Sequence, residues 1–400
     1  MFELNKNRLE QGSNKWLVQE AKGEGYKKDI PPFTVADTDF LVPEFLVDGW
    51  KTYLENTSLG YGATTDAYYD AVIKWYQTRH NSKIEKSWIT CTTGVISAIS
   101  NILKAFTDVG DSVLIMSPVY HLFYIVLDNL DRKKVIHNLK VDDQQSYAID
   151  FEKLEHQIKN EDVKVILLCS PHNPVGKVWS KDELLKISQL ADQYNVLVIA
   201  DEIHNDLILE GSKHTVYTEL NEVSRNHVFL CTSPSKTFNL AGLKSANVVI
   251  PNEVLRDKYN ASNDKLISGN VHVNTMGIIA TQIVYEKGHA YLDALLSLIK
   301  DNYNYIDKYL KTKHPKIKVS PLEGTYLLWL DFRSLKIAEE TLVESLNKES
   351  LYFEQGSIFG ENGTGFMRMN IATTKEVIEK AMYRLSDVLS QGENLWKKLD

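Results

Sequence analysis

The fold is decided by residues 163–204, which read VKVILLCSPHNPVGKVWSKDELLKISQLADQYNVLVIADEIH. Two apolar runs, 163–169 and 196–201, have the length and the β-branched content of buried strands. Between them, Ser180 and Glu183 form the S-x-x-E capping box that begins many helices, and apolar residues then recur at helical spacing. A strand, a helix and a strand in this order predict two parallel strands joined by a crossover helix.

The same alternation extends over residues 85–250. The apolar residues at positions 95, 99, 102 and 106 share one face of a helix that begins just after Gly94. Four further strands are expected at 88–92, 112–116, 228–232 and 246–250. This part of the chain therefore predicts a doubly wound α/β sheet.

The last hundred residues follow a different pattern. We expect a long amphipathic helix around 290–312, strands at 324–331 and 365–371, and helices at about 338–350 and 374–391. Three parts are expected. Residues 1–30 form an N-terminal arm that joins the small domain, residues 31–288 form a large domain, and residues 289–400 form a small α+β domain. Since no flexible linker separates the two domains, they are expected to share a cleft.

The bulk composition excludes several classes of protein. The 400 residues carry 45 Lys and Arg against 53 Asp and Glu, without a basic run, which argues against a nucleic-acid partner. The N-terminus lacks the apolar stretch of a signal peptide, and the apolar runs are too short to span a bilayer, so we expect a cytoplasmic protein without a membrane partner. Cys91, Cys169 and Cys231 lie too far apart for a disulfide framework or a zinc site, and no metal is expected.

One lysine stands in a hydroxyl-rich turn. Residues 232–238 read TSPSKTF and follow a predicted strand. A lysine that forms a Schiff base needs a rigid element end, hydroxyls that can hold an adjacent phosphate, and burial that favours the neutral amine. Lys236, with Ser233 and Ser235 beside it, meets these conditions, although a solvated surface lysine is the alternative interpretation of this residue taken alone.

Polar residues follow two neighbouring predicted strands. Asp201 ends the strand at 196–201, at the edge where open α/β sheets bind ligands. Its carboxylate can pair with a protonated pyridine nitrogen, and a helix N-cap is the alternative. Asn173, in the loop after the strand at 163–169, can donate its amide to a phenolic oxygen. These two partners are those of a pyridoxal 5'-phosphate (PLP) ring.

Other residues suit the remaining parts of such a site. Gly94, Val95 and Ile96 begin a helix whose first N–H groups and positive dipole end suit a phosphate. Tyr120 follows another strand and is positioned to stack on a flat ring, with a packed core tyrosine as the alternative. Arg368 stands in an otherwise apolar strand and needs an anion, either a substrate α-carboxylate or an acidic side chain.

Six motifs resemble those of the fold-type I PLP enzymes, the aspartate aminotransferase superfamily, and more narrowly its MalY/PatB branch of cystathionine β-lyases and cysteine-S-conjugate β-lyases. The resemblance covers nearly the whole chain. The motifs are Val35-Ala36-Asp37-Thr38-Asp39-Phe40, Tyr61-Gly62, residues 170–179 (SPHNPVGKVW), Asp201-Glu202-Ile203-His204, residues 233–239 (SPSKTFN) and Glu323-Gly324-Thr325-Tyr326-Leu327.

The resemblance implies an aspartate-aminotransferase-like fold, with a mainly parallel seven-stranded sheet in the large domain, and PLP as the cofactor. It implies that Lys236 carries PLP as a Schiff base, that Asp201 pairs with the ring nitrogen, and that Asn173 contacts the phenolic oxygen. Tyr120 would stack on the ring, and Tyr120 and Asn173 would also line the substrate. The phosphate would be held by Gly94, Val95 and Ile96 together with Ser233 and Ser235.

The resemblance also implies a homodimer, because Tyr61 would reach the phosphate bound in the neighbouring subunit. Arg368 would take the substrate carboxylate. Three positions depart from the pattern of the relatives. His204 stands where many aminotransferases place a tyrosine, Lys244 replaces an arginine and loses its bidentate contact with the phosphate, and Leu17 replaces the aspartate usual after Lys-Trp.

The expected reaction is a β-elimination that cleaves cystathionine or a related cysteine S-conjugate to a thiol, pyruvate and ammonia. Lys236 would be both the cofactor lysine and the base that removes the Cα proton. Two alternatives stay open, an aminotransferase that uses the same residues and a regulatory protein that binds a transcription activator. The residues do not choose among cystathionine, S-alkyl cysteines and cysteinylglycine conjugates.

Overall fold

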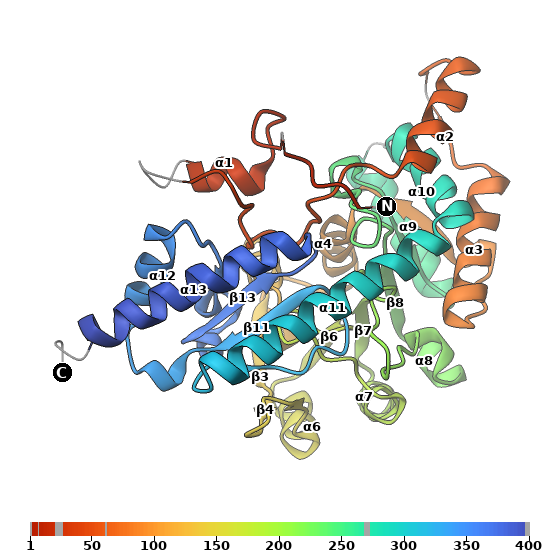
Figure 1. The fold of residues 1–400 in the computed structure, drawn as a ribbon. Helices are drawn as coiled ribbons and strands as arrows, with labels where there is room; N and C mark the ends of the chain where they lie inside the picture. The colour runs from red at the N-terminus through yellow and green to blue at the C-terminus, as the bar shows by residue number, and fades with distance from the viewer. Residues whose placement is uncertain (1, 7, 21–26, 61, 268–272, 397–400) are drawn as a thin grey trace.

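The structure, a computed structural model, describes residues 2–6, 8–20, 27–60, 62–267 and 273–396 (Figure 1). Its larger sheet has seven strands in the order β1-β9-β8-β7-β6-β2-β3. The strands are β1 Ile89–Thr92, β2 Ser112–Ser117, β3 Lys133–Asn138, β6 Val163–Cys169, β7 Leu197–Asp201, β8 Val228–Thr232 and β9 Ala246–Val249. The neighbouring pairs from β8 to β3 are parallel, so the predicted fold class, a mainly parallel seven-stranded α/β sheet, is confirmed.

Helices before, between and after these strands account for most of the same part of the chain. They are α2 Glu44–Glu55, α3 Asp66–His80, α4 Val95–Phe106, α5 His121–Asn129, α6 Phe151–Asn160, α7 Lys181–Gln193, α8 Glu222–Asn226, α9 Glu253–Ile267 and α10 Thr275–Lys287. The predicted capping box is present at α7, where Glu183 N donates to Ser180 Oγ (3.2 Å) and Ser180 N donates to Glu183 Oε2 (2.8 Å).

Both faces of the large sheet are covered, because neighbouring residues of a strand point to opposite faces and both sets are apolar. Val165 of β6 belongs to the same buried cluster as Ile99 of α4. The next residue, Ile166, belongs to the other cluster, with Leu184 of α7. Strands buried on both faces have continuous apolar sequences, which is why β6, β7 and β8 were recognisable.

Two strands differ from the predictions. β3 was not predicted, because it is an edge strand with polar and exposed positions at its ends and pairs only with β2. β9 was predicted, but it runs antiparallel to β1 and β8. Residues 233–245 before it hold only turns and the short 3-10 helix Ala241–Leu243, so no crossover helix returns the chain to the opposite end of the sheet.

A second, antiparallel sheet lies in the C-terminal part of the chain, with the strand order β10-β11-β13-β12. Its strands are β10 Lys318–Val319, β11 Leu327–Asp331, β12 Glu354–Gln355 and β13 Phe366–Asn370, and its helices are α11 His289–Lys313, α12 Glu339–Lys348 and α13 Lys375–Trp396. Figure 1 shows the long helices α11 and α13 crossing the same side of the molecule. β4 Lys140–Val141 and β5 Tyr147–Ala148 form a separate ribbon.

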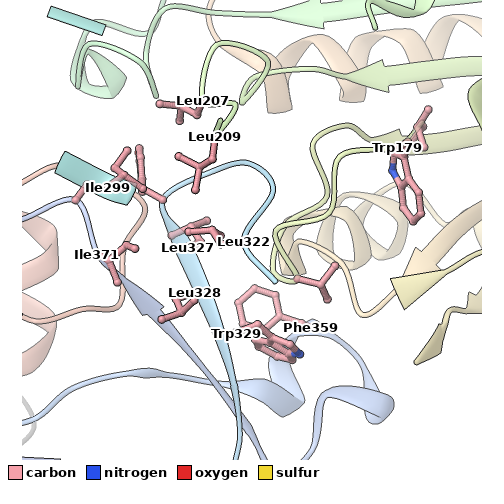
Figure 2. Packing of buried hydrophobic residues seen from close by; sticks show 14 of the residues in the cluster. Trp179, Leu207, Leu209, Ile299, Leu322, Leu327, Leu328, Trp329, Phe359 and Ile371 are labelled. Carbon is pink, nitrogen blue, oxygen red and sulfur yellow. The ribbon is translucent and has the colours of Figure 1, made fainter. Parts of the chain in front are cut away.

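The two larger sheets meet at a seam between the loop after β7 and the loop before β11. Thr325 N donates to Leu207 O (2.7 Å), and Leu209 N donates to Glu323 O (2.9 Å). Figure 2 shows Leu207 and Leu209 beside Leu322 and Leu327 in the apolar packing at this seam. The first residues of the strand predicted at 324–331 form this seam, so β11 begins only at Leu327.

The N-terminal arm is structured: it contains the helix α1 Asn14–Glu20 and buries Trp16. Arg384 of α13 pairs with Asp29 at 2.6 Å, which ties the arm to the C-terminal part of the chain. The division into domains at residues 30 and 288 stays a prediction. Among the described helices, none is both long and apolar enough to cross a membrane.

Candidate active site

A cavity of about 350 Å³ lies at the carboxyl edge of β6, β7 and β8. Every predicted cofactor residue except Tyr61 lines it, and Tyr61 lies outside the described residues. Those residues are Gly94, Val95, Ile96, Tyr120, Asn173, Asp201, His204, Ser233, Ser235, Lys236 and Lys244. The fold therefore brings together in one cavity side chains that lie as far as 150 positions apart in the sequence.

Lys236 follows β8 in a turn that fixes its main chain. Phe238 N donates to Pro234 O (2.9 Å), and Thr237 Oγ1 donates to the buried carboxylate of Asp206 (2.8 Å). The Lys236 ammonium donates from Nζ to Ala36 O at 2.7 Å. Burial lowers the pKa of Lys236 to about 8, so a substantial part of this amine is neutral near pH 7 to 8 and can react with a carbonyl group.

Asp201 is the last residue of β7, the strand next to β8. It is 4% exposed, and its Oδ1 accepts one hydrogen bond from Ile203 N at 3.1 Å. Burial raises the pKa of this carboxyl to about 7, because the cations near it do not offset the loss of water. The residues after Asp201 form turns rather than a helix, so the N-cap interpretation is wrong. The carboxyl is suited to a cationic ligand.

The start of α4 forms another wall of the cavity. Gly94 has a φ of 126°, and a Cβ added there would meet no atom within 4 Å, so the backbone is open to a ligand. The first N–H groups of the helix follow at Val95 and Ile96. Of the two predicted serines, Ser233 donates its hydroxyl to Ser245 O (2.6 Å) and accepts from Ser235 N (3.1 Å). Ser233 therefore braces the turn, which leaves Ser235 as the hydroxyl better placed for a ligand.

Asn173 and Arg368 form one unit. Arg368 Nη1 donates to Asn173 Oδ1 at 3.3 Å, which occupies the acceptor end of the amide and leaves the Nδ2 end for a ligand. Arg368 is 2% exposed and does not itself line the cavity described above. Its Nη2 donates to Thr34 O at 2.5 Å and lies 3.7 Å from Glu354, while its Nε has no hydrogen-bond partner among the described residues.

The remaining predicted residues occupy the rim and the base of the cavity. Tyr120 precedes α5, and burial raises the pKa of its hydroxyl to about 12. His204 is buried, its Nδ1 lacks a partner in the described part of the chain, and burial lowers its pKa so far that the ring stays neutral. Lys244 is exposed and has a φ of 52°. Of the three cysteines, Cys169 alone lines the cavity.

The sequence did not single out the contacts around Lys236 Nζ. Tyr326 OH also donates to Ala36 O, at 3.1 Å, and Asn370 Nδ2 donates to Val35 O and Asp37 O on either side. A main-chain carbonyl leaves no signature in a sequence. The only available signal was that Ala36 and Tyr326 stand in two of the motifs that resemble the relatives.

A mainly parallel seven-stranded sheet, with a half-buried lysine after one strand and a buried carboxyl at the end of its neighbour, defines an aspartate-aminotransferase-like protein of fold type I. The chain belongs to the family described as aminotransferase class I and II, whose family model matches residues 35–385.

Three relatives illustrate the likeness. Cystathionine beta-lyase PatB of Bacillus subtilis is 36% identical over 391 residues, which cover 97% of this chain and 100% of that protein. Protein MalY of Escherichia coli is 31% identical, covering 90% and 92%. The crystal structure of cystalysin from Treponema denticola, which contains a pyridoxal 5'-phosphate cofactor, matches with a TM-score of 0.94 and 37% identity, covering 98% and 99%.

Proposed function

We propose that this protein is a PLP-dependent carbon–sulfur lyase that cleaves cystathionine or a related cysteine S-conjugate to a thiol, pyruvate and ammonia. The observation that carries the proposal is the placement, in one cavity, of the Lys236 amine after β8 and the buried Asp201 carboxyl at the end of β7. The three relatives support the reaction class, since one is named a cystathionine beta-lyase and another contains PLP.

The cavity fits PLP at each of its polar positions. Asp201 lacks a strong cationic partner and would hold the protonated ring nitrogen. The open backbone at Gly94, with the N–H groups of Val95 and Ile96 and the hydroxyl of Ser235, would hold the phosphate, and Lys244 adds a positive charge at the rim. Asn173 would donate from Nδ2 to the phenolic oxygen, while Tyr120 would cover one face of the ring. His204 stays without an assigned role.

When bound, PLP supplies an electron sink that stabilises negative charge at the substrate Cα. Asp201 would keep the proton on the ring nitrogen and so maintain that sink. Lys236, once displaced by the substrate amine, would take the Cα proton at Nζ, and the sulfur would leave from Cβ as a thiolate. Ala36 O, which accepts from Nζ, orients this base.

Arg368 would bind the substrate carboxylate. Its guanidinium is buried, and within the described part of the chain its Nε has no partner and the carboxylate of Glu354 lies 3.7 Å away, so the guanidinium retains capacity for an anion. Asn173 and Tyr120 would line the substrate beside it. We further propose a homodimer in which Tyr61 reaches the neighbouring cavity, and a cytoplasmic location, which suits three cysteines that form no disulfide.

The test is to incubate the purified protein with L-cystathionine and with an S-alkyl cysteine, without a keto acid, while pyruvate and free thiol are measured together. Equimolar pyruvate and thiol over many turnovers is the expected result. A single-turnover loss of the yellow colour that only a keto acid restores would identify an aminotransferase instead, the function that the family description also includes.

A further inference from the structure

The segment of residues 35–39, here called the Ala36 segment, brings a main-chain carbonyl to the catalytic lysine. Ala36 O accepts from Lys236 Nζ at 2.7 Å and from Tyr326 OH at 3.1 Å, which uses both of its lone pairs. The position of Nζ therefore depends on where Ala36 lies.

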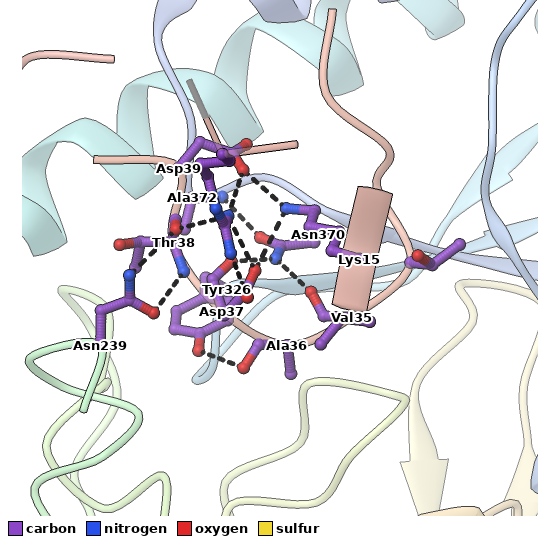
Figure 3. A network of polar contacts seen from close by, with 12 residues as sticks. Lys15, Val35, Ala36, Asp37, Thr38, Asp39, Asn239, Tyr326, Asn370 and Ala372 are labelled. Carbon is purple, nitrogen blue, oxygen red and sulfur yellow. Dashed lines mark hydrogen bonds and ion pairs between the residues drawn. The ribbon is translucent and has the colours of Figure 1, made fainter. Parts of the chain in front are cut away.

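The Ala36 segment contains neither helix nor strand, and side chains supply most of the hydrogen bonds to its backbone, beside main-chain bonds at Asp39 such as that of its N–H to Ala372 O (3.2 Å). Asn370 Nδ2 donates to Val35 O (2.7 Å) and Asp37 O (2.6 Å). Asn239 pairs with both the N–H and the carbonyl of Thr38, at 3.1 Å each. Figure 3 shows these contacts converging on the segment from different elements.

The N-terminal arm supplies further contacts through two cations. Arg8 donates from Nη1 to Thr38 O (2.9 Å) and Asp39 Oδ1 (2.8 Å), and from Nη2 to Asp37 Oδ2 (2.5 Å). Lys15 donates to Asp39 Oδ1 (2.8 Å) and lies 3.4 Å from Asp37 Oδ1. The Lys15 side chain is 1% exposed and that of Asp39 is 3% exposed. Buried pairs of this kind add little net stability, but they specify one arrangement of the chain.

The same network sets the charge near Lys236. The charged and titratable groups that face Lys236 are Asp37, Arg368, Asp201, Lys244 and the imidazole of His204. Burial lowers the pKa of Lys236, and Asp37 opposes this effect more than any other group does. Burial alone would raise the pKa of Asp37, but the charge of Lys15 and the hydrogen bond and charge of Arg8 lower it, so Asp37 stays ionised.

We propose that Arg8 and Lys15 are positioning residues for Lys236, which act through the Ala36 segment by fixing the Ala36 carbonyl and by offsetting the charge of Asp37. The inference rests on the proposed function, in which Lys236 is the reacting amine. Loss of Arg8 leaves Asp37 less compensated, which favours the cationic form of the lysine nitrogen and raises the pH at which it titrates. If Asp39 loses its charge, Arg8 and Lys15 no longer pair with it and offset the charge of Asp37 more fully. The pH at which the lysine nitrogen titrates then falls.

The experiment follows the visible absorption of the PLP-loaded protein against pH, without substrate. We expect the midpoint of this titration to lie about one pH unit higher in Arg8→Met than in the wild type, which is the effect of a close charge that is partly screened. In Asp39→Asn we expect the midpoint to lie lower than in the wild type. Arg8→Lys keeps the charge and should shift less than Arg8→Met. Lys27→Met is the matched control, because Lys27 is an exposed arm cation that contacts Glu349 rather than the Ala36 segment.

Opposite signs for Arg8→Met and Asp39→Asn support the proposal, since a merely structural role would not reverse the shift. An unshifted midpoint in an Arg8→Met protein that melts cooperatively overturns it. Should Arg8→Met not fold, an Asp39→Asn midpoint equal to that of the wild type overturns it equally. A wild-type protein that binds no PLP overturns the proposed function itself. If instead the wild-type absorption titrates with pH and the variants have the same midpoint, only the inference about Arg8 and Lys15 fails.

Discussion

Two walls of the cavity differ in construction. The strand-end wall consists of Asn173, Asp201 and Lys236, which follow β6, β7 and β8. Parallel pairing places Cys169, Asp201 and Cys231 side by side across these strands. The loop wall is formed by Ala36, which lines the cavity, and is held by the rest of the Ala36 segment, which belongs to no helix or strand.

The two walls depend on different forces. The strand-end wall is held by main-chain hydrogen bonds and by apolar clusters on both faces of the sheet, so one substitution alters one side chain and leaves the frame in place. The loop wall is held by a few polar side chains that each satisfy several backbone groups. One substitution there removes several contacts to the backbone at once, and we expect it to displace the wall.

The largest effect is expected from a substitution that removes chemistry from the strand-end wall and leaves its frame intact. Lys236→Ala should lower turnover by about 10⁴-fold, since it removes the general base and the covalent anchor together. The measurement is joint release of pyruvate and thiol, with melting temperature as the check on folding. Lys213→Ala, an exposed lysine, is the control. Substantial lyase activity in Lys236→Ala would exclude the assigned role.

A smaller loss is expected at the neighbouring strand end. Asp201→Asn should lower kcat/KM by about 10²- to 10³-fold, which corresponds to roughly 3–4 kcal/mol for a buried charge that loses its partner. Asp192→Asn, at an exposed position of α7, should leave kcat/KM unchanged. Near-normal kinetics of Asp201→Asn would mean that no cationic group sits against this carboxyl.

The loop wall is tested by two asparagines with the same hydrogen-bonding role. Asn370 Nδ2 donates to two carbonyls of the Ala36 segment, whereas Asn302 Nδ2 donates to Ile371 O and Thr373 O, both at 2.9 Å. Either change to Ala removes two hydrogen bonds to main-chain carbonyls and should cost about 2–3 kcal/mol of unfolding free energy. Only Asn370→Ala should also lower kcat, by about tenfold, which is the effect of roughly 1.4 kcal/mol on the barrier. Equal kcat values in the two variants would show that the loop wall does not serve the reaction.

The smallest effect is a pH dependence at the point where the two walls meet. The neutral Lys236 amine reacts with the cofactor aldehyde, so the rate at which cofactor-free protein regains its visible band should rise with pH and level off above about 8. Below that pH the rate should change by about tenfold per pH unit, following the neutral fraction. Stopped-flow absorbance measures it. A rate that does not change with pH would show that the protonation of the Lys236 amine does not limit the rebinding of the cofactor.

The difference between the two walls also explains what the sequence could reveal. β6, β7 and β8 are buried apolar runs, and in a parallel sheet the residues that follow such runs must gather at one edge, so Asn173, Asp201 and Lys236 were all predictable. Contacts such as Asn370 with Val35 join residues 335 positions apart through a backbone atom, and no periodicity encodes them. The sequence did not predict the polar edge strand β3 or the antiparallel direction of β9 for a related reason. Pairing with other strands determines both features.

The span between Val35 and Asn370 has a consequence for the nascent chain. The arm and the Ala36 segment leave the ribosome first, and the amide that holds them is made 335 residues later, roughly half a minute at ordinary rates of translation. Until then Val35 O and Asp37 O lack the amide donor that Asn370 supplies, although the strands of the other wall have already been synthesised. Capture of the cofactor in its final geometry is therefore expected to be a late event in the life of each new chain, after Asn370 has been synthesised.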